Sequence, residues 1–393
     1  MHYYQKMEKN VGKNYIFTFL SNFNLTSVLW VIFLAYKGMS LTEIGILEGI
    51  FHVTSFFMEV PTGAVADIFG RKTSRILGKL TGVISNIIFI SSGNFWLFAL
   101  SMFVTALSYN LESGAGQALV YDSLLSISKE KEYLVISGRI EFITQTAMFL
   151  GYIAGGYFAG KSFETAYIIA IIIGIINFLY AFSFTEPEIE YKNEIKGLKG
   201  FFIQNRDSFN EIKKNKKLLF VIMFSEFASM MCTTVFFYLQ NYMYSEGFTT
   251  YKIGLILALA GVAGAVFGLL THKIEKLLSE KGILMLLPLI MAISLIFMGI
   301  SEFSYIFFIF ISAAESVIFV AYSDYVNRNI PSDKRATILS MCSMVFSMYM
   351  IFIFPLVGKL GDIYGLKLTF LLLGIGLFIL SSINIFILFK SKK

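Results

Sequence analysis

Four glutamates lie inside long apolar stretches of this chain, where a charged side chain is costly and usually faces a water-filled path. Glu226 and Glu315 lie well inside their stretches, so neither side chain easily reaches the end of its helix. A carboxylate in such a place can bind a proton on one side of a membrane and release it on the other. We therefore expect proton exchange, or binding of a cationic ligand, at these acids: Glu59, Glu112, Glu226 and Glu315. The alternative is that one or two of them pair with Lys79 or Arg139 and serve only assembly.

Further polar side chains accompany these acids. Asp122 follows Glu112, and Asp324 follows Glu315, at similar spacings in the two halves of the chain. Polar contacts to a ligand are also expected from Asn22, Gln117, Gln145, Tyr238 and Asn241.

One predicted helix carries a stripe of groups that could exchange protons. Glu48, His52, Ser55 and Glu59 are spaced by four, three and four residues, which places them along one helix face. The alternative is that Glu48 lies in water and that His52 bonds a neighbouring carbonyl or hydroxyl group. For His52 the structural interpretation is favoured.

A compact charged turn follows that helix, with the sequence Gly63-Ala-Val-Ala-Asp67-Ile-Phe-Gly70-Arg71-Lys72. Gly63 lets a neighbouring helix come close, and Gly70 permits a tight or left-handed turn. Asp67 and Arg71 can form a charge-assisted contact where lipid gives way to water. Such a contact at the end of two helices can hold one state of a two-state protein, although the basic residues could also merely set topology.

Composition predicts an integral membrane protein. Hydrophobic residues make up 56% of the chain and charged residues 15%, and the mean hydropathy is +0.71, so a soluble core could not be covered by polar surface. Twelve apolar segments are long enough to cross a bilayer as helices. They lie at 14–36, 42–67, two within 80–111, 142–160, 165–185, 218–244, 253–271, 282–301, 303–322, 336–358 and 368–389.

Charge predicts the orientation of these crossings. If the N-terminus is cytoplasmic, 27 of the 32 Lys and Arg residues fall in inside segments, as the positive-inside rule requires. Both termini are then cytoplasmic in a multi-pass protein, and we expect a bacterial inner (plasma) membrane location. The net charge of +6 follows from this bias, so nucleic-acid binding is not indicated. No cleavable signal peptide is expected, because the first apolar run is long enough to span.

The chain reads as two halves joined by a polar linker. Gly38-Met-Ser-Leu-Thr-Glu-Ile-Gly45 is echoed by Gly247-Phe-Thr-Thr-Tyr-Lys-Ile-Gly254 about half a chain later. We expect a six-helix bundle at 1–185, a cytoplasmic linker at 186–217 and a second bundle at 218–393. The linker is expected either as an amphipathic helix on the inner leaflet or as a solvated tether. No good copy of the charged turn is expected in the second half, because 268–282 offers its charges in a different order.

The charged turn resembles the signature loop of the major facilitator superfamily, whose pattern is Gly-x-x-x-Asp-Arg-x-Gly-Arg-Lys. The preceding Glu59-Val-Pro61-Thr also matches, whereas the first Arg of the pattern is Ile68 here. The resemblance implies an all-α integral membrane fold of twelve transmembrane helices in two pseudo-symmetric six-helix bundles. It also implies secondary transport by alternating access, with the residues of the turn as a conformational switch: Gly63, Asp67, Gly70, Arg71 and Lys72.

Within that superfamily the chain is similar to bacterial drug/proton antiporter-like efflux members. Gly151-Tyr-Ile-Ala-Gly155-Gly156-Tyr-Phe-Ala-Gly160 is similar to their glycine-rich motif, but its Pro is absent, and close helix packing also explains the glycines. The family's fourth-helix Arg corresponds to Asn110. With no Arg or Lys expected near mid-membrane, organic anions are disfavoured as substrates. The resemblance implies proton-coupled, multidrug-type efflux of hydrophobic small molecules, cationic ones among them.

Other function classes stay open or are disfavoured. An importer or facilitator of a neutral solute, such as a sugar or nucleoside, would call for more Asn, Gln and Trp in the central helices. No nucleophile–base pair or nucleotide loop indicates an enzyme. The three His and two Cys residues are too scattered for a metal site, and no cofactor is expected. The expected partners are a small-molecule substrate, protons and membrane lipid, and the protein is expected to be a monomer.

Overall fold

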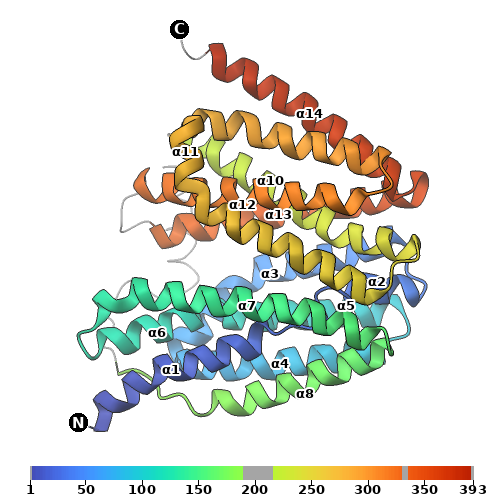
Figure 1. Cartoon of the computed structure of the whole chain (residues 1–393). Helices are drawn as coiled ribbons and strands as arrows, with labels where there is room; N and C mark the ends of the chain where they lie inside the picture. Colours follow the sequence, from blue (N-terminus) through green and yellow to red (C-terminus); the bar gives the residue numbers. More distant parts are fainter. Residues whose placement is uncertain (1, 189–215, 330–334, 391–393) are drawn as a thin grey trace. The chain divides into compact units, whose positions relative to one another are not determined.

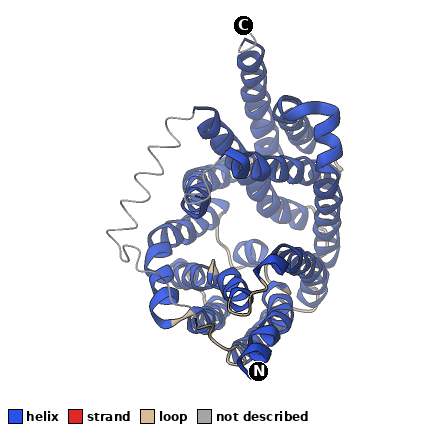
Figure 2. Ribbon diagram, turned by 90° about the vertical axis from the view of Figure 1, so that its left-hand side faces the viewer, coloured by secondary structure: helices blue, strands red, loops and turns tan. Residues whose placement is uncertain are grey.

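The computed structural model describes residues 2–188, 216–329 and 335–390, and every regular element within these ranges is helical (Figure 2). The first helices, shown in Figure 1, are α1 (His2–Asn22), α2 (Trp30–Tyr36), α3 (Leu41–Phe69), α4 (Arg71–Ser91), α5 (Phe95–Glu112), α6 (Ala115–Leu125), the 3₁₀ turn η1 (Glu130–Glu132), α7 (Tyr133–Ala159) and α8 (Phe163–Ala181). The later helices are α10 (Lys216–Ser245), α11 (Thr250–Ile300), α12 (Ser304–Asn329), α13 (Arg335–Tyr364) and α14 (Leu366–Lys390).

The helices of the structure differ in number from the twelve predicted crossings because two crossings are broken and one helix is bent. The first crossing is broken between α1 and α2, and the fourth between α5 and α6. α11 bends at Ser279, whose φ of 61° is not helical, and Figure 1 shows its two arms running in opposite directions. When α11 is counted as two crossings, the described residues contain the twelve that hydropathy predicts. By length and composition, eight helical segments of the described ranges, α11 among them, are able to span a membrane.

Internal contacts divide the chain into two compact units. Unit 1 comprises Met1–Leu29 and Ile50–Ile203, and unit 2 comprises Trp30–Gly49 and Gln204–Lys393. α3 therefore begins in unit 2 and continues into unit 1. The predicted domain boundaries at 1–185, 186–217 and 218–393 stay a prediction, since nearly all of the expected linker lies outside the described residues.

Small residues and hydroxyl groups let the helices of unit 1 approach closely. The Ser108 hydroxyl of α5 donates to the Gly78 carbonyl of α4 at 2.7 Å. On α7, a Cβ atom at Gly155 would overlap the carbonyl of Leu25, in the break of the first crossing. The glycine-rich run of α7 therefore has a packing role, because only glycine leaves room for that irregular backbone.

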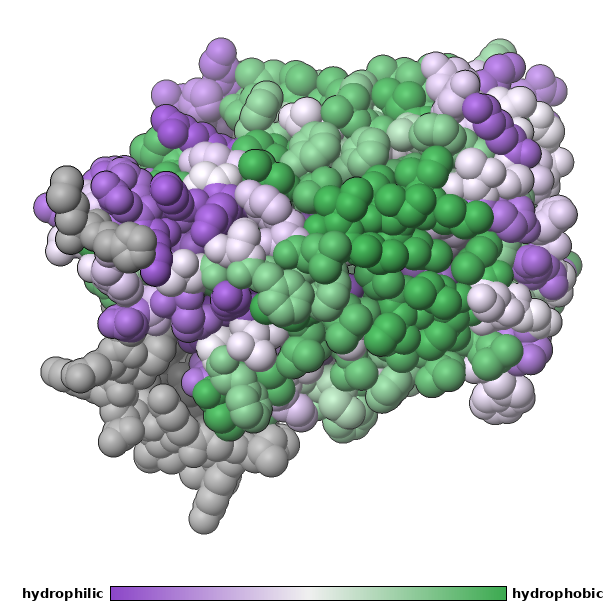
Figure 3. All heavy atoms as spheres, turned by 90° about the horizontal axis from the view of Figure 1, so that it is seen from below, coloured by the Kyte–Doolittle hydropathy of each residue, from purple (hydrophilic) through white to green (hydrophobic). Residues whose placement is uncertain are grey.

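Apolar side chains face outward as well as inward. In unit 1, Phe17 and Phe184 are buried in one cluster with Leu119. On the outer face of α8, Ile172 is 51% exposed and Leu179 is 61% exposed. Figure 3 shows a hydrophobic band on the face in view, between two zones of hydrophilic residues. This arrangement fits a helix surface that lies against lipid rather than water.

Candidate functional site

The turn between α3 and α4 joins the two helices through a single glycine. Gly70 has a φ of 96°, a conformation that side chains rarely adopt. Asp67, in the last turn of α3, accepts a hydrogen bond from Arg71 Nη1 at 2.7 Å, and Arg71 Nε lies 3.8 Å from Asp122 Oδ2 on α6. The predicted Asp67–Arg71 contact is therefore present. Open space lies beside Gly63, so no described neighbour makes the close approach expected there.

Glu186 completes this turn. Because Gly70 has no side chain, α4 has no cap of its own. The Glu186 carboxylate accepts hydrogen bonds from the backbone N–H groups of Arg71 at 2.6 Å and Lys72 at 2.8 Å. A carboxylate at a helix N-terminus is stabilised by both the free N–H groups and the helix dipole. Nearby, burial lowers the pKa of Lys13, and the positive charge of Lys72 lowers it further.

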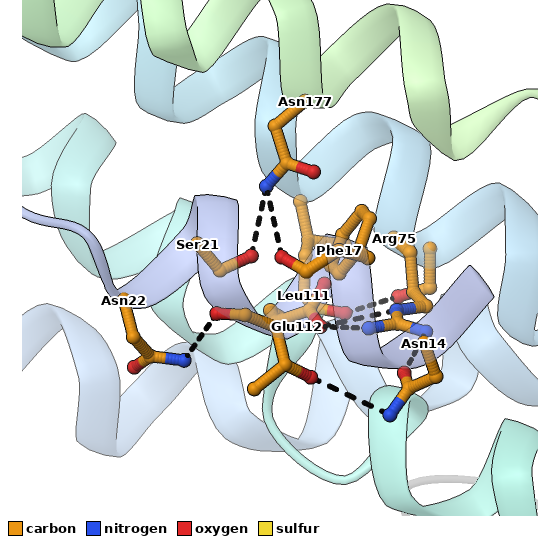
Figure 4. Close-up of polar contacts among 10 residues, drawn as sticks. Asn14, Phe17, Ser21, Asn22, Arg75, Leu111, Glu112 and Asn177 are labelled. Atoms are coloured by element: carbon orange, nitrogen blue, oxygen red, sulfur yellow. Dashed lines mark hydrogen bonds and ion pairs between the residues drawn. The ribbon is translucent and has the colours of Figure 1, made fainter. Parts of the chain in front are cut away.

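Glu112, one of the four predicted acids, is neutralised by a buried arginine of α4 (Figure 4). Arg75 is 2% exposed, and its Nε and Nη2 atoms lie 3.0 and 2.9 Å from Glu112 Oε1. Its Nη1 donates to Asn14 Oδ1 at 2.8 Å, and the guanidinium lies 3.9 Å from the centre of the Phe17 ring. Glu112 therefore has an ion-pair partner, which is neither Lys79 nor Arg139.

The predicted stripe on α3 is anchored to α5 at one position. The Ser55 hydroxyl donates to Asn110 Oδ1 at 2.7 Å, and Asn110 Nδ2 donates to the Ser55 carbonyl at 2.6 Å. Asn110, the position at which the family resemblance would place an Arg, thus serves helix packing. His52 is buried, with its ring 5.1 Å from that of Phe51, and Glu59 is half-buried.

Glu226 and Glu315 lie close together within unit 2, on α10 and α12. The Glu315 carboxylate is near enough for its charge to act on Glu226, and both residues are half-buried. The Ser229 hydroxyl donates to Glu315 Oε1 at 2.8 Å, and the Tyr322 hydroxyl hydrogen-bonds Glu226. Tyr322 also lies 3.0 Å from the Cys342 sulfur. Among the described residues, no Lys or Arg forms an ion pair with either carboxylate.

A pocket lies beside this pair, between α10, α11 and α12. Tyr322 lines it, so one residue contacts both the pocket and Glu226. Ser225 also lines the pocket and is 1% exposed. Its hydroxyl has no hydrogen-bond partner among the described residues. Glu275, Glu280 and Asp324 add acidic groups to the lining, and Tyr325 lines it as well.

The other predicted ligand contacts are dispersed. Gln117 and Gln145 are exposed, and Gln145 donates to Glu141 on its own helix at 2.8 Å. The Asn22 amide donates to the Thr18 carbonyl at 2.9 Å. Tyr238 is fully buried, and its hydroxyl donates to main-chain carbonyls. Asn241 is buried, and its amide has no hydrogen-bond partner among the described residues.

Arg75 and Glu186 are residues that sequence reasoning did not select. Arg75 lies one helical turn beyond Arg71, a spacing that places it on the same face of α4 and could have indicated a role inside unit 1. Glu186 directly follows the sixth crossing and offered no signal beyond its charge. Within the described ranges, no group of three or more His, Cys, Asp or Glu side chains could hold a metal ion.

The chain belongs to the major facilitator superfamily, whose family model matches residues 14–355. It is therefore a secondary transporter and a multi-pass membrane protein, with a small molecule as substrate, and it is not an enzyme. The predicted all-α fold of twelve crossings is confirmed.

Two relatives cover much of the chain. The uncharacterized MFS-type transporter YxaM of Bacillus subtilis is 22% identical over 360 residues, which are 90% of this chain and 89% of the relative. An uncharacterized MFS-type transporter of Methanocaldococcus jannaschii is 22% identical over 301 residues, or 74% and 73% of the two chains.

Two solved structures share the fold. A mutant of the nucleoside transporter NupG has a TM-score of 0.77 at 14% identity, over 95% of this chain and 98% of that one. A bacterial homolog of the human lysosomal transporter Spinster, in an inward-facing and unoccupied conformation, has a TM-score of 0.72 at 14% identity, over 97% of both chains.

Proposed function

We propose that this transporter is a proton-coupled exporter of hydrophobic small molecules, cationic compounds among them, which works by alternating access. The observation that carries the proposal is the contrast between its acids. Glu112 forms an ion pair with Arg75. Glu226 and Glu315 instead lie near each other, have hydroxyl partners, and form no ion pair with a Lys or Arg among the described residues. Two neighbouring carboxylates repel each other when both are ionised, and a proton or a cationic ligand relieves that repulsion.

Competition between the proton and the ligand supports antiport. If a cation and a proton bind the same carboxylate pair, binding of one releases the other, and exchange needs no further machinery. The acid-lined pocket next to Tyr322 supports a path for positive charge toward this pair. The positive-inside bias supports an orientation with both termini in the cytoplasm of a bacterial cell.

The proposal is tested with the purified protein in liposomes that contain a pH-sensitive dye, with tetraphenylphosphonium as the hydrophobic cation. The parent protein is expected to move protons when the cation is added, with a rate that depends on pH. Glu226→Gln and Glu315→Gln should each abolish this pH dependence, because a neutral amide cannot exchange a proton. Glu141→Gln is the matched control, because Glu141 is exposed on α7 and, among the described residues, bonds only Gln145 of its own helix.

The same assay can also contradict the proposal of proton coupling. If both Gln variants at the pair keep the pH dependence of the parent while binding the cation normally, the carboxylates are not the coupling site. A loss of pH dependence in Glu141→Gln as well would indicate a general effect of removing negative charge.

A second candidate is import of a neutral polar solute such as a nucleoside or sugar. It is favoured by two adjacent buried amides of α10, Gln240 and Asn241, whose polar atoms have no hydrogen-bond partner among the described residues. Such amides suit the hydroxyl and carbonyl groups of a neutral solute. Uptake of a labelled nucleoside that Asn241→Leu abolishes and Glu226→Gln leaves intact would favour this function over cation export.

A further inference from the structure

A second copy of the switch sequence lies at the turn between α13 and α14. Gly358-x-x-x-Asp362-Ile-Tyr-Gly365-x-Lys367 matches Gly63-x-x-x-Asp67-Ile-Phe-Gly70-x-Lys72 in spacing and in residue type. In both copies one helix ends directly before the second glycine and the next begins directly after it. Gly365 has a φ of 76°, as Gly70 has one of 96°. The second half of the chain therefore does carry a copy, outside the 268–282 segment where none was expected.

The carboxylate of the second copy caps a distant helix. Asp362 Oδ1 accepts a hydrogen bond from the Leu41 N–H at 2.9 Å, and Oδ2 accepts one from the Thr42 N–H at 2.8 Å. The Thr42 hydroxyl donates to the same Oδ2 atom at 2.5 Å. Leu41 and Thr42 are the first two residues of α3. Asp362 therefore caps α3 in the same way as Glu186 caps α4.

Asp362 completes a cap that α3 cannot complete by itself. Ser40 and Glu43 form a capping box, in which the Ser40 N–H donates to Glu43 at 2.8 Å and the Glu43 N–H donates to Ser40 at 3.2 Å. The capping box leaves the N–H groups of Leu41 and Thr42 without partners on their own helix. When Asp362 is withdrawn, these two groups lose their bonds while the capping box stays intact.

Close packing accompanies this cap. A Cβ atom at Gly45 of α3 would lie 2.5 Å from the Cα atom of Pro355 of α13, and one at Gly358 would overlap the Leu41 carbonyl. The Tyr238 hydroxyl of α10 lies 3.2 Å from the Leu41 carbonyl and 3.0 Å from that of Phe354. The backbone at the start of α3 therefore packs directly against the backbone of α13. Because close-packed surfaces do not deform gradually, we expect this contact to be either formed or broken.

We infer that Asp362 is a positioning residue for transport, whose carboxylate latches the start of α3 to α13 in this state and releases it in the alternate one. The first residues of α3 belong to unit 2 and the rest to unit 1, so this contact acts on a helix that both units share. Asp67 lies at the opposite end of the same helix. The two copies thus act on the two ends of α3, and this inference rests on the transporter assignment but on neither a substrate nor proton coupling.

The test measures how often the start of α3 opens. Ile44, which is 0% exposed, is replaced by Cys in a background with Cys232→Ala and Cys342→Ala, and its reaction with a maleimide is timed in the full-length protein. Asp362→Asn should raise the labelling rate by about fivefold or more, because it weakens the charge-assisted hydrogen bonds that hold the start of α3 against α13. Asp362→Glu, which restores the charge, should return the rate toward that of the parent.

Ser40→Ala is the matched control, because it weakens the cap of the same helix without cutting the link to α13. It should leave the labelling rate nearly unchanged, although hydrogen exchange at the Glu43 amide becomes faster. The inference is overturned if Asp362→Asn labels at the parent rate, or if Ser40→Ala labels as fast as Asp362→Asn. Since no substrate or proton gradient is involved, failure here is distinct from failure of the proton-coupling assay.

Discussion

Arg75 is the ion-pair partner of Glu112, and this contact sets Glu112 apart from the other predicted acids. With the guanidinium donating twice to one of its oxygens, Glu112 has a fixed ion-pair partner inside unit 1. The aromatic rings of Phe17 and Phe184 lie against the same guanidinium, 3.9 and 4.8 Å from their centres. Glu226 and Glu315 have hydroxyl partners instead. Acids that look equivalent in the sequence thus differ through an ion pair with a neighbouring arginine.

Removal of Arg75 should therefore be costly. Arg75→Met removes the ion-pair partner of the half-buried Glu112, and loss of one partner of a buried ion pair costs up to about 3–5 kcal/mol. We expect a clearly lower Tm in detergent, measured by thermal unfolding. The double variant Arg75→Met with Glu112→Met should recover much of the loss, because the carboxylate is then no longer left without its arginine. Equal Tm values for the parent and Arg75→Met would show that the pair adds nothing to stability.

The partners of these residues could be predicted less well than the residues themselves. The four acids stand out because each interrupts an apolar run, and hydropathy alone reveals that. Arg75 and Asn14 come from different helices, and their meeting at Glu112 depends on how α1, α4 and α5 pack. Asp362 is a different case, because the spacing of its turn repeats that of Asp67 and was visible in the sequence.

At the scale of elements, irregular backbone is tolerated where a glycine faces it. The break between α1 and α2 places main-chain atoms of Asn24 and Leu25 against α7, at Gly151 and Gly155. A side chain on α7 at either position would push the break outward. The glycine-rich run is thus explained by contact within unit 1.

Gly155→Ala should destabilise the protein, because the added Cβ atom meets backbone that cannot move aside. Overpacking of this kind costs about 1–3 kcal/mol, which thermal unfolding detects as a lower Tm. Gly138→Ala is the control on the same helix, since nothing lies within 4 Å of the position of its Cβ atom. That variant should keep the parent Tm or exceed it slightly, because alanine favours helix. A similar fall in Tm for both variants would refute the packing explanation.

At the scale of the whole molecule, hydropathy predicts the crossings because lipid demands a long apolar helix for each of them. The predicted segments 42–67 and 165–185 correspond closely to α3 and α8. The breaks were not predicted, because polar residues such as Asn24 and Ser113 are compatible with either a continuous or an interrupted helix. The bend of α11 at Ser279 lies in a connection that the sequence indicated only by its charges.

The orientation of the crossings is open to a direct test. Alkaline phosphatase fused after Gly93, in the exposed turn between α4 and α5, should be active because that turn is expected outside. A fusion after Lys131, between α6 and α7, should be inactive, while green fluorescent protein in the same place should fluoresce. The reverse pattern at both sites would place the termini outside the cell.

Glu186 links the residues that follow α8 to the turn between α3 and α4. The helix α8 ends at Ala181. Five residues later, the Glu186 carboxylate accepts hydrogen bonds from the backbone N–H groups in the first turn of α4. A displacement of residues 182–188 would therefore reach the Asp67 turn through this one carboxylate. Its removal by Glu186→Gln would weaken that connection while leaving every spanning helix unaltered.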